Sequence, residues 1–399
     1  MRIIICWLFC QFWFLEGCSA VNTVGQHTQP DTQLFTGAEN LKAYLPLLKN
    51  KKVACVVHHA SRVGKSHLVD TLLSLKVDVV KILAPEHGFR GTADAGEKVD
   101  NDKDTKTGLP IVSLYGKNKK PTAEMLKDVE VVLFDLQDVG VRFYTYISTL
   151  HYVIEACGEN NKALIVLDRP NPHAHYTDGP ILESGFESFI GMHHVPVVYG
   201  MTIGEYGKMI NGEKWTKLKS EANLTVIPCV NYDRKKRYDI PLPPSPNLPN
   251  PTAVLLYPTL CFFEGTDYSV GRGTTKQFQI IGHPGMQSDF SFTPAPNVGA
   301  KDPFQNGKTC YGYDFSSASR DQLFSSQKID LDLLVKVYRE TIAANQNFFL
   351  SNLFFDKLAG TDKFRKMLIE GKSAKEIRAS WQEGLKSFEA TRKKYLMYE

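Results

Sequence analysis

The chain has 399 residues, of which 43% are apolar and 23% are charged, as in ordinary folded proteins. This length suffices for two domains, each with its own core. The net charge of +4 is small and spread along the sequence, and the short basic runs lack interleaved aromatic residues, so we expect no nucleic-acid partner.

Residues 1–18 are predicted to be a signal peptide. Met1-Arg2 gives a positive start, and residues 3–15 are almost wholly apolar but too few to span a bilayer as an ordinary helix. Residues 15–18 (Leu-Glu-Gly-Cys) resemble a bacterial lipobox, in which Glu16 is unusual, so both lipidation of Cys18 and plain secretion remain open. Residues 19–33 are polar and are expected to form a tether. We therefore expect an exported protein, periplasmic or anchored to the outer membrane, that meets a membrane only through a lipid.

Residues 34–240 are predicted to form a Rossmann-like parallel sheet domain of the α/β class. Apolar runs typical of strands alternate with segments at helical spacing. The runs are continuous rather than alternating, which indicates strands covered on both faces. Strands are expected at residues 52–57, 78–83, 129–134 and 163–167, and helices at 66–75, from 121 onward, and at 148–158.

Polar residues follow each of these four strands. They are His58 and His59, then Glu86 and His87, then Asp135, Gln137 and Asp138, and finally Asp168, Arg169 and Asn171. The carboxyl ends of parallel strands share one edge of a sheet, where ligands bind. The sequence therefore predicts a functional cleft at this edge.

Residues 241–399 are predicted to form a smaller α+β domain that closes over the first. A proline-rich stretch, residues 241–251, marks an extended segment that crosses between the two domains. A loop rich in Gly and Thr, residues 263–274, follows it, and helices are expected near residues 331–345 and 374–392.

Several chemistries do not match the sequence. Gly64-Lys65-Ser66 lacks the preceding glycine of a phosphate loop, because that position holds His59. The five cysteines after Cys18 contain no C-x-x-C spacing, which argues against structural zinc and redox motifs. His58-His59 and His193-His194 could bind a metal, but adjacent histidines on a strand point to opposite faces, which favours one buried and one exposed side chain in each pair. We therefore expect neither a metal nor another cofactor.

Carboxylates, arginines and aromatic residues remain, and this set suits glycoside hydrolysis. Glu86 is flanked by Pro85, His87 and Phe89, and partial burial there would raise its pKa toward that of a general acid. The alternative is that Glu86 pairs with Arg90 and only holds the loop. Spacing alone favours this alternative.

Several long strings occur in series along the chain. They are residues 84–91 (Ala-Pro-Glu-His-Gly-Phe-Arg-Gly), 108–116 (Gly-Leu-Pro-Ile-Val-Ser-Leu-Tyr-Gly), 134–146, 167–172, 200–205, 245–247 (Ser-Pro-Asn), 264–266 and 269–274. In content and order they resemble the exo-β-N-acetylmuramidase (NamZ-type) family, formerly a domain of unknown function. The resemblance covers nearly all of the chain after the tether.

The resemblance implies a Rossmann-like domain, a C-terminal auxiliary domain and an active-site cleft between them. It implies release of N-acetylmuramic acid from the non-reducing end of peptidoglycan fragments, with muropeptides or disaccharides as partners. It also makes Glu86 the leading catalytic residue, reversing the preference from spacing. His173 departs from the small or aliphatic residue expected at this position, which bears on fine substrate preference.

Glu86 is expected to protonate the leaving glycosidic oxygen, whereas the group acting opposite it stays open. The candidates are Asp135, Asp138, Asp168, Glu205 and Glu264, with Tyr144, Tyr146 and the substrate's own acetamido group as further possibilities. A guanidinium suits the lactyl carboxylate of N-acetylmuramic acid, because it can donate two parallel hydrogen bonds. The choices are Arg90, Arg142, Arg169 and Arg272.

The full candidate site combines these groups. The catalytic set is Glu86, His87, Asp135, Asp168 and Glu264, and the substrate-binding set is Arg90, Gln137, Arg142, Tyr144, Tyr146, Arg169, Asn171, Glu205 and Arg272. Two rival functions are a non-catalytic surface lipoprotein that captures muropeptides for uptake and a nucleotide-binding Rossmann protein.

Overall fold

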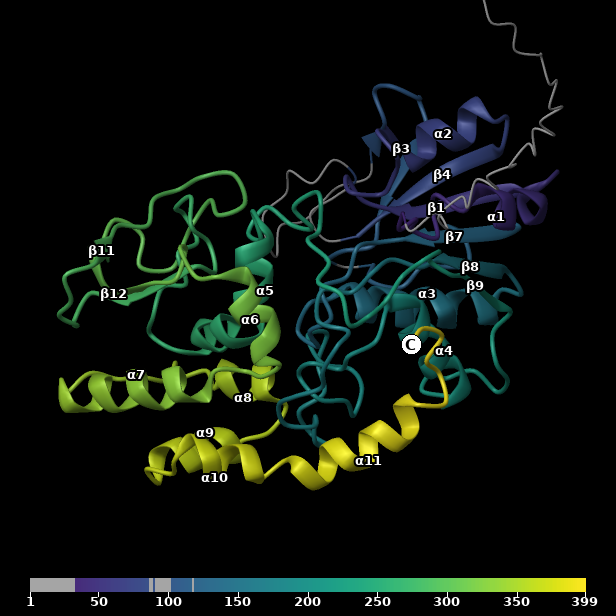
Figure 1. The fold of residues 1–399 in the computed structure, drawn as a ribbon. Helices are drawn as coiled ribbons and strands as arrows, with labels where there is room; N and C mark the ends of the chain where they lie inside the picture. Colours follow the sequence, from purple (N-terminus) through teal and green to yellow (C-terminus); the bar gives the residue numbers. More distant parts are fainter. Residues whose placement is uncertain (1–32, 86–88, 90–101, 117) are drawn as a thin grey trace, which may run out of the picture. The chain divides into compact units, whose positions relative to one another are not determined.

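The computed structural model describes residues 33–85, 89, 102–116 and 118–399 (Figure 1). Leu34–Glu399 form one unit by their internal contacts. The predictions for Cys18, Glu86, His87 and Arg90, and those for the signal peptide and most of the tether, lie outside the described residues.

A seven-stranded sheet organises the first part of this unit. Its strand order is β5-β6-β4-β1-β7-β8-β9, and all neighbouring pairs are parallel except β5 with β6. The strands are β1 (Lys52–Val57), β4 (Asp78–Ala84), β5 (Asp102–Lys103), β6 (Pro110–Ser113), β7 (Val131–Asp135), β8 (Ala163–Leu167) and β9 (Leu224–Ile227). The predicted parallel α/β fold is confirmed, and the four strands followed by polar clusters are neighbours in the order β4-β1-β7-β8.

Helices cover both faces of this sheet, which explains its continuous apolar strands. Helices α1 (Leu41–Leu48) and α2 (Leu68–Ser74) share one apolar core with alternate β1 residues such as Cys55. Helices α3 (Tyr146–Glu159) and α4 (Ile203–Gly212) share the other core with the intervening β1 residues, such as Val56. Each strand residue therefore needs an apolar side chain, whichever face it points to.

Two predicted elements in this domain differ from the structure. The helix expected at residues 66–75 begins only at Leu68, because Ser66–His67 forms β3 in a hairpin with β2 (Arg62–Val63). The helix expected from residue 121 is a run of turns. Shortly after this run, the Glu130 N–H donates a hydrogen bond to the Lys52 carbonyl, and the Glu130 carboxylate accepts one from the Lys52 N–H. These bonds fix the chain beside β1 and leave little length for a helix before it.

The second part of the unit combines a small antiparallel sheet with helices, as predicted. The sheet order is β10 (Ile280–His283), β12 (Cys310–Asp314) and β11 (Ser291–Phe292). The helices are α5 (Pro251–Leu260), the 3-10 helix η1 (Cys261–Gly265), α6 (Arg320–Ser326), α7 (Leu331–Ala343), α8 (Phe354–Ala359), α9 (Lys363–Ile369), α10 (Ala374–Ala379) and α11 (Gln382–Arg392). The single helix expected at residues 374–392 is interrupted between α10 and α11, where the Trp381 indole donates a hydrogen bond to Asp178.

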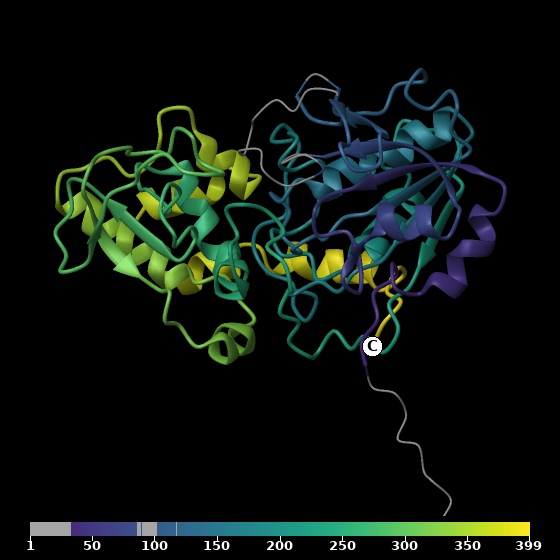
Figure 2. The same cartoon turned by 90° about the horizontal axis from the view of Figure 1, so that it is seen from above.

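Two segments connect the second part to the sheet domain. Helix α11 runs back from α10 toward the sheet, as both ribbon views show (Figures 1 and 2), and the guanidinium of Arg392 donates hydrogen bonds to the Gly200 carbonyl. The proline-rich segment passes the carboxyl edge of the sheet, where the Pro243 carbonyl lies 2.6 Å from Nε2 of His59. The next carbonyl, that of Pro244, accepts a hydrogen bond from the Tyr144 hydroxyl at 2.9 Å.

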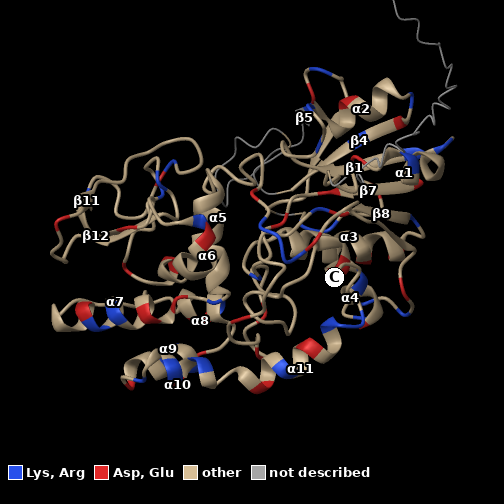
Figure 3. Cartoon of the chain, viewed as in Figure 1, with Lys and Arg blue, Asp and Glu red and all other residues tan. Residues whose placement is uncertain are grey.

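Charges of both signs alternate along the outer helices α7, α10 and α11 (Figure 3). Within the described residues, no helix combines the length and the apolar character needed to cross a bilayer. The five cysteines Cys55, Cys157, Cys229, Cys261 and Cys310 are free and buried.

Candidate active site

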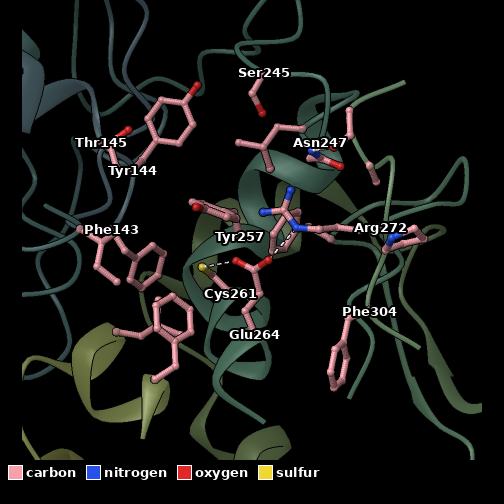
Figure 4. A pocket seen from close by; sticks show the side chains of 18 of the residues that line it. Phe143, Tyr144, Thr145, Ser245, Asn247, Tyr257, Cys261, Glu264, Arg272 and Phe304 are labelled. Atoms are coloured by element: carbon pink, nitrogen blue, oxygen red, sulfur yellow. Dashed lines mark hydrogen bonds and ion pairs between the residues drawn. The ribbon is translucent and has the colours of Figure 1, made fainter. Parts of the chain in front are cut away.

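A cavity of about 650 Å³ lies where the carboxyl edge of the sheet meets α5 and η1 (Figure 4). The sheet domain lines it with Tyr115, which follows β6, and with residues 143–146 at the start of α3. The second part lines it with Tyr257 on α5, Glu264 on η1, and Arg272 in the loop after η1. The cavity thus combines aromatic surfaces, a carboxylate and a guanidinium drawn from both parts of the unit.

Glu264 and Arg272 form an ion pair in the wall of this cavity. Oε1 of Glu264 accepts a hydrogen bond from Nε of Arg272 at 2.6 Å (Figure 4). Both side chains are 22% exposed, and the guanidinium carbon lies 5.0 Å from the ring centroid of Phe278. Burial alone would lower the pKa of Arg272, but the Glu264 carboxylate raises it, so the guanidinium stays charged.

Tyrosine rings form the opposite wall. Tyr144 and Tyr146 pack edge to face with centroids 4.9 Å apart, and Tyr144 also packs against Tyr257 at 6.2 Å. The Tyr146 hydroxyl lies 3.2 Å from Nδ1 of His58, which follows β1. Burial raises the pKa of Tyr144 well above its usual range, so its hydroxyl is neutral and suits sugar packing better than nucleophilic attack.

Arg142 lies outside this cavity. Its side chain is fully buried and donates hydrogen bonds to the carbonyls of Pro180, Val195, Leu358 and Ala359 at 2.6–3.0 Å. The last two carbonyls belong to α8, so Arg142 ties the sheet domain to the second part. Its two terminal nitrogens donate to the backbone rather than toward a ligand, and its buried Nε has no hydrogen-bond partner among the described residues.

Asp135 and Arg169 form a buried ion pair at the carboxyl ends of β7 and β8. Nε and the Nη2 atom of Arg169 donate to the two carboxylate oxygens of Asp135 at 2.5 and 2.8 Å. Gln137 follows β7 and donates to the carbonyls of Asp138 and Pro170. Gln137 and Arg169 line a second cavity of about 630 Å³, which shares no lining residue with the first. They therefore lie apart from Glu264 and Arg272.

Asp168 and Glu205 belong to a buried network around the start of α4. The Asp168 carboxylate accepts hydrogen bonds from the Thr202 hydroxyl, the Gly204 N–H and the Tyr398 hydroxyl at 2.5–2.8 Å. Glu205 completes the capping box with Thr202 and accepts from Arg234 at 2.6 Å. Such contacts satisfy the free N–H groups at the start of the helix and hold the C-terminal residues in place, which indicates a structural role.

Burial raises the pKa of Asp168 to about 7, although the Tyr398 hydrogen bond lowers it and Glu205 raises it further. Because this value exceeds the ordinary one, the contribution of Asp168 to stability is complete below about pH 4 and is lost as the pH rises through 7. From pH 5 to pH 8 the free energy of unfolding of wild type should fall by about 3 kcal/mol relative to that of Asp168→Asn, because the side chain of the variant stays neutral. Denaturant unfolding at both pH values measures this difference.

The matched control is Asp128→Asn, since Asp128 is exposed. This control should follow the wild-type pH dependence. If the free energy of unfolding of Asp168→Asn changed with pH as it does in wild type, a raised pKa at Asp168 would be contradicted.

The sequence model for the N-terminal domain of exo-β-N-acetylmuramidase NamZ matches residues 53–252, and the model for its C-terminal domain matches residues 255–398. The chain belongs to the exo-β-N-acetylmuramidase NamZ family. It is 37% identical to the peptidoglycan β-N-acetylmuramidase NamZ of Bacillus subtilis (strain 168), over 97% of this chain and 99% of that protein.

Two crystal structures of DUF1343 family proteins from Bacteroides fragilis NCTC 9343 share the fold. One is 44% identical with a TM-score of 0.84, covering 92% of this chain and 99% of its own. The other is 29% identical with a TM-score of 0.76, covering 93% of this chain and all of its own. The Rossmann-like domain and its smaller partner are therefore the fold of these relatives.

The structure divides the residues of the candidate site. Four of them line the first cavity: Tyr144, Tyr146, Glu264 and Arg272. Arg169 and Gln137 line the second, while Asp135, Asp168, Glu205, Asn171 and Arg142 are buried in structural contacts. Asn171 donates to the Met201 carbonyl, and His173, the departure from the expected family pattern, is buried beside the Val139 carbonyl.

Glu86 lies outside the described residues and follows β4 in the sequence. The last residue of β4, Ala84, pairs with Ser113 of β6, and the cavity residue Tyr115 comes two positions later. Tyr115, Asn247, Tyr257, Phe278 and Phe304 also line the cavity and were absent from the candidate set. Tyr115 and Asn247 stand inside NamZ-like strings, which was the available signal. Tyr257 carries no such signal, because only the tertiary fold brings α5 to this edge.

Proposed function

We propose that this protein is an exo-β-N-acetylmuramidase that releases N-acetylmuramic acid from the non-reducing end of peptidoglycan fragments. The observation that carries the proposal is the match of both NamZ domains along nearly the whole chain, together with the Bacillus subtilis relative. Membership of this family makes the chain a glycosidase. The first cavity supports the substrate class, because aromatic rings and a carboxylate are what sugar hydrolysis needs.

In this proposal Glu86 is the general acid that protonates the glycosidic oxygen, and His87 beside it assists. The support is that both residues follow β4 in the sequence, and that Tyr115, which follows the neighbouring strand β6, lines the cavity. The carboxyl ends of parallel strands are where such sheets bind ligands. A protonated acid at this position donates its proton as the sugar–oxygen bond breaks.

Glu264 is the described carboxylate best suited to act opposite Glu86. Glu264 and the exposed Asp302 are the acidic residues that line the cavity among the described residues. Glu264 is held in place by Arg272, whereas Asp135, Asp168 and Glu205 are occupied elsewhere. As an ion-paired carboxylate, Glu264 can activate a water, stabilise the positive charge that develops on the sugar, or orient the substrate's acetamido group.

Export completes the proposal. Peptidoglycan lies outside the cytoplasmic membrane, and residues 1–18 resemble a signal peptide that ends at Cys18. We propose a periplasmic protein or one anchored to the outer membrane by lipid at Cys18. Labelling of cells with a radioactive fatty acid should mark the wild type and fail to mark Cys18→Ser.

The disaccharide MurNAc–GlcNAc separates an enzyme from a capture protein. Incubation with the purified protein should give equal amounts of N-acetylmuramic acid and N-acetylglucosamine, and the reverse disaccharide, GlcNAc–MurNAc, should stay intact. Calorimetry on the same samples detects binding. Tight binding of MurNAc–GlcNAc without turnover would contradict the enzyme and favour a muropeptide-capturing lipoprotein.

A further inference from the structure

Arg272 is presented to the first cavity by a rigid turn. It stands between Gly271 and Gly273, whose φ angles are +77° and +78°. A Cβ at Gly271 would come within 2.6 Å of Ile280, and one at Gly273 within 2.6 Å of both the Ala295 carbonyl and Pro303. Both positions therefore require glycine, and the neighbouring backbone holds the turn in place.

The Arg272 side chain is fixed at one edge and open at the other. Nε donates to Glu264, and the guanidinium lies over the ring of Phe278. Among the described residues, none accepts a hydrogen bond from the two terminal nitrogens. In Figure 4 these nitrogens point away from Glu264, toward the interior of the cavity. Arg272 therefore offers two parallel donors in a preset orientation.

Two parallel N–H donors on a planar cation match a carboxylate. N-acetylmuramic acid differs from N-acetylglucosamine by one lactyl ether group, which carries a carboxylate. We infer that Arg272 binds the lactyl carboxylate through its two terminal nitrogens and so sets the preference for N-acetylmuramic acid. This inference rests on the proposed function and adds the residue that recognises the substrate.

Other described cations suit this role less well. Arg142 donates to four carbonyls, and Arg169 is paired with Asp135 beside the second cavity. Lys301 lines the first cavity but is exposed, and its ammonium is a point charge without a fork of donors. Arg272 combines partial burial, fixed orientation and a free edge.

The test compares binding of free N-acetylmuramic acid with that of its lactyl carboxamide, which has the same shape but no charge. Calorimetry with the full-length protein should show that wild type prefers the carboxylate. Arg272→Met should raise the Kd for N-acetylmuramic acid about 100-fold, the loss expected for a charge-assisted pair of hydrogen bonds. The Kd for the carboxamide should change little.

Arg272→Lys keeps the positive charge but loses the two parallel N–H donors, so it should keep only part of the preference for the carboxylate. It provides a second measurement if Arg272→Met folds poorly. Arg320→Met, on α6 and outside the cavity, removes the same charge and should keep the wild-type preference. The inference is overturned if wild type does not distinguish the two sugars, or if either Arg272 variant keeps the preference at its full wild-type size. Because binding requires no turnover, this result stands apart from whether the protein hydrolyses glycans. In an active enzyme the loss should appear in KM rather than kcat, since the lactyl group lies away from the bond that breaks.

Discussion

Glu86→Gln is expected to slow the release of N-acetylmuramic acid from MurNAc–GlcNAc by about 10²- to 10⁴-fold. Glutamine has nearly the same shape as glutamate but cannot donate an acidic proton. The departing sugar would then leave as an alkoxide, which is a poor leaving group at neutral pH. Product release under saturating substrate measures the effect, with an unchanged thermal midpoint as evidence that the variant folds.

The leaving group distinguishes a general acid from other roles of Glu86. An aryl muramide with an acidic phenol needs little protonation, so Glu86→Gln should be much less impaired on it than on the disaccharide. Glu264→Gln, as the matched carboxylate change, should impair both substrates to a similar degree, because its proposed role does not involve the leaving group. An equal loss on both substrates in Glu86→Gln would contradict a general acid.

Arg142→Met is expected to lower the free energy of unfolding by about 4 kcal/mol or more. The substitution keeps much of the side-chain volume but leaves the carbonyls of Pro180, Leu358 and Ala359 without their donor, whereas the Val195 carbonyl keeps the Leu182 N–H. Each buried, unsatisfied polar group costs about 1–3 kcal/mol. Denaturant midpoints of the purified proteins measure this loss, and a low soluble yield is expected at the same time.

A suitable control is Arg320→Met on α6. Arg320 makes an ion pair with Asp239, but its side chain is 43% exposed, so the change should stay within about 0.5 kcal/mol. If Arg142→Met were as stable as this control, Arg142 would not tie the two parts of the unit together. Its position in a family string would then need a role in binding.

The parallel sheet was predictable because strands buried on both faces must be apolar throughout. The runs at Val53–Val57 and Leu164–Leu167 carry that pattern, and the structure places both in the sheet core. The grouping of polar clusters along one edge followed from the same prediction, since neighbouring parallel strands end together. Helix boundaries were less predictable, as the turns after Pro121 show. The helix expected there is limited by a backbone hydrogen bond between Glu130 and Lys52 of β1, which is distant in the sequence.

The roles of individual residues within the candidate site could not be predicted from the sequence. Arg142 and Arg272 both stand in family strings, yet one is fully buried among carbonyls and the other faces a cavity. Asp168 and Glu264 are both acidic residues in family strings, yet the first holds the start of α4 and the tail near Tyr398. The contacts of Arg142 with Ala359 and of Asp168 with Tyr398 join residues more than 200 positions apart, which periodicity and local spacing do not encode.

The tetrasaccharide MurNAc–GlcNAc–MurNAc–GlcNAc gives the most direct test of exo-acting muramidase function. Mass spectrometry of the first products should find free N-acetylmuramic acid and the trisaccharide GlcNAc–MurNAc–GlcNAc in equal amounts. The reaction should stop there, because the new non-reducing end is N-acetylglucosamine. Two disaccharides as the first products, or an intact tetrasaccharide after prolonged incubation, would contradict the account.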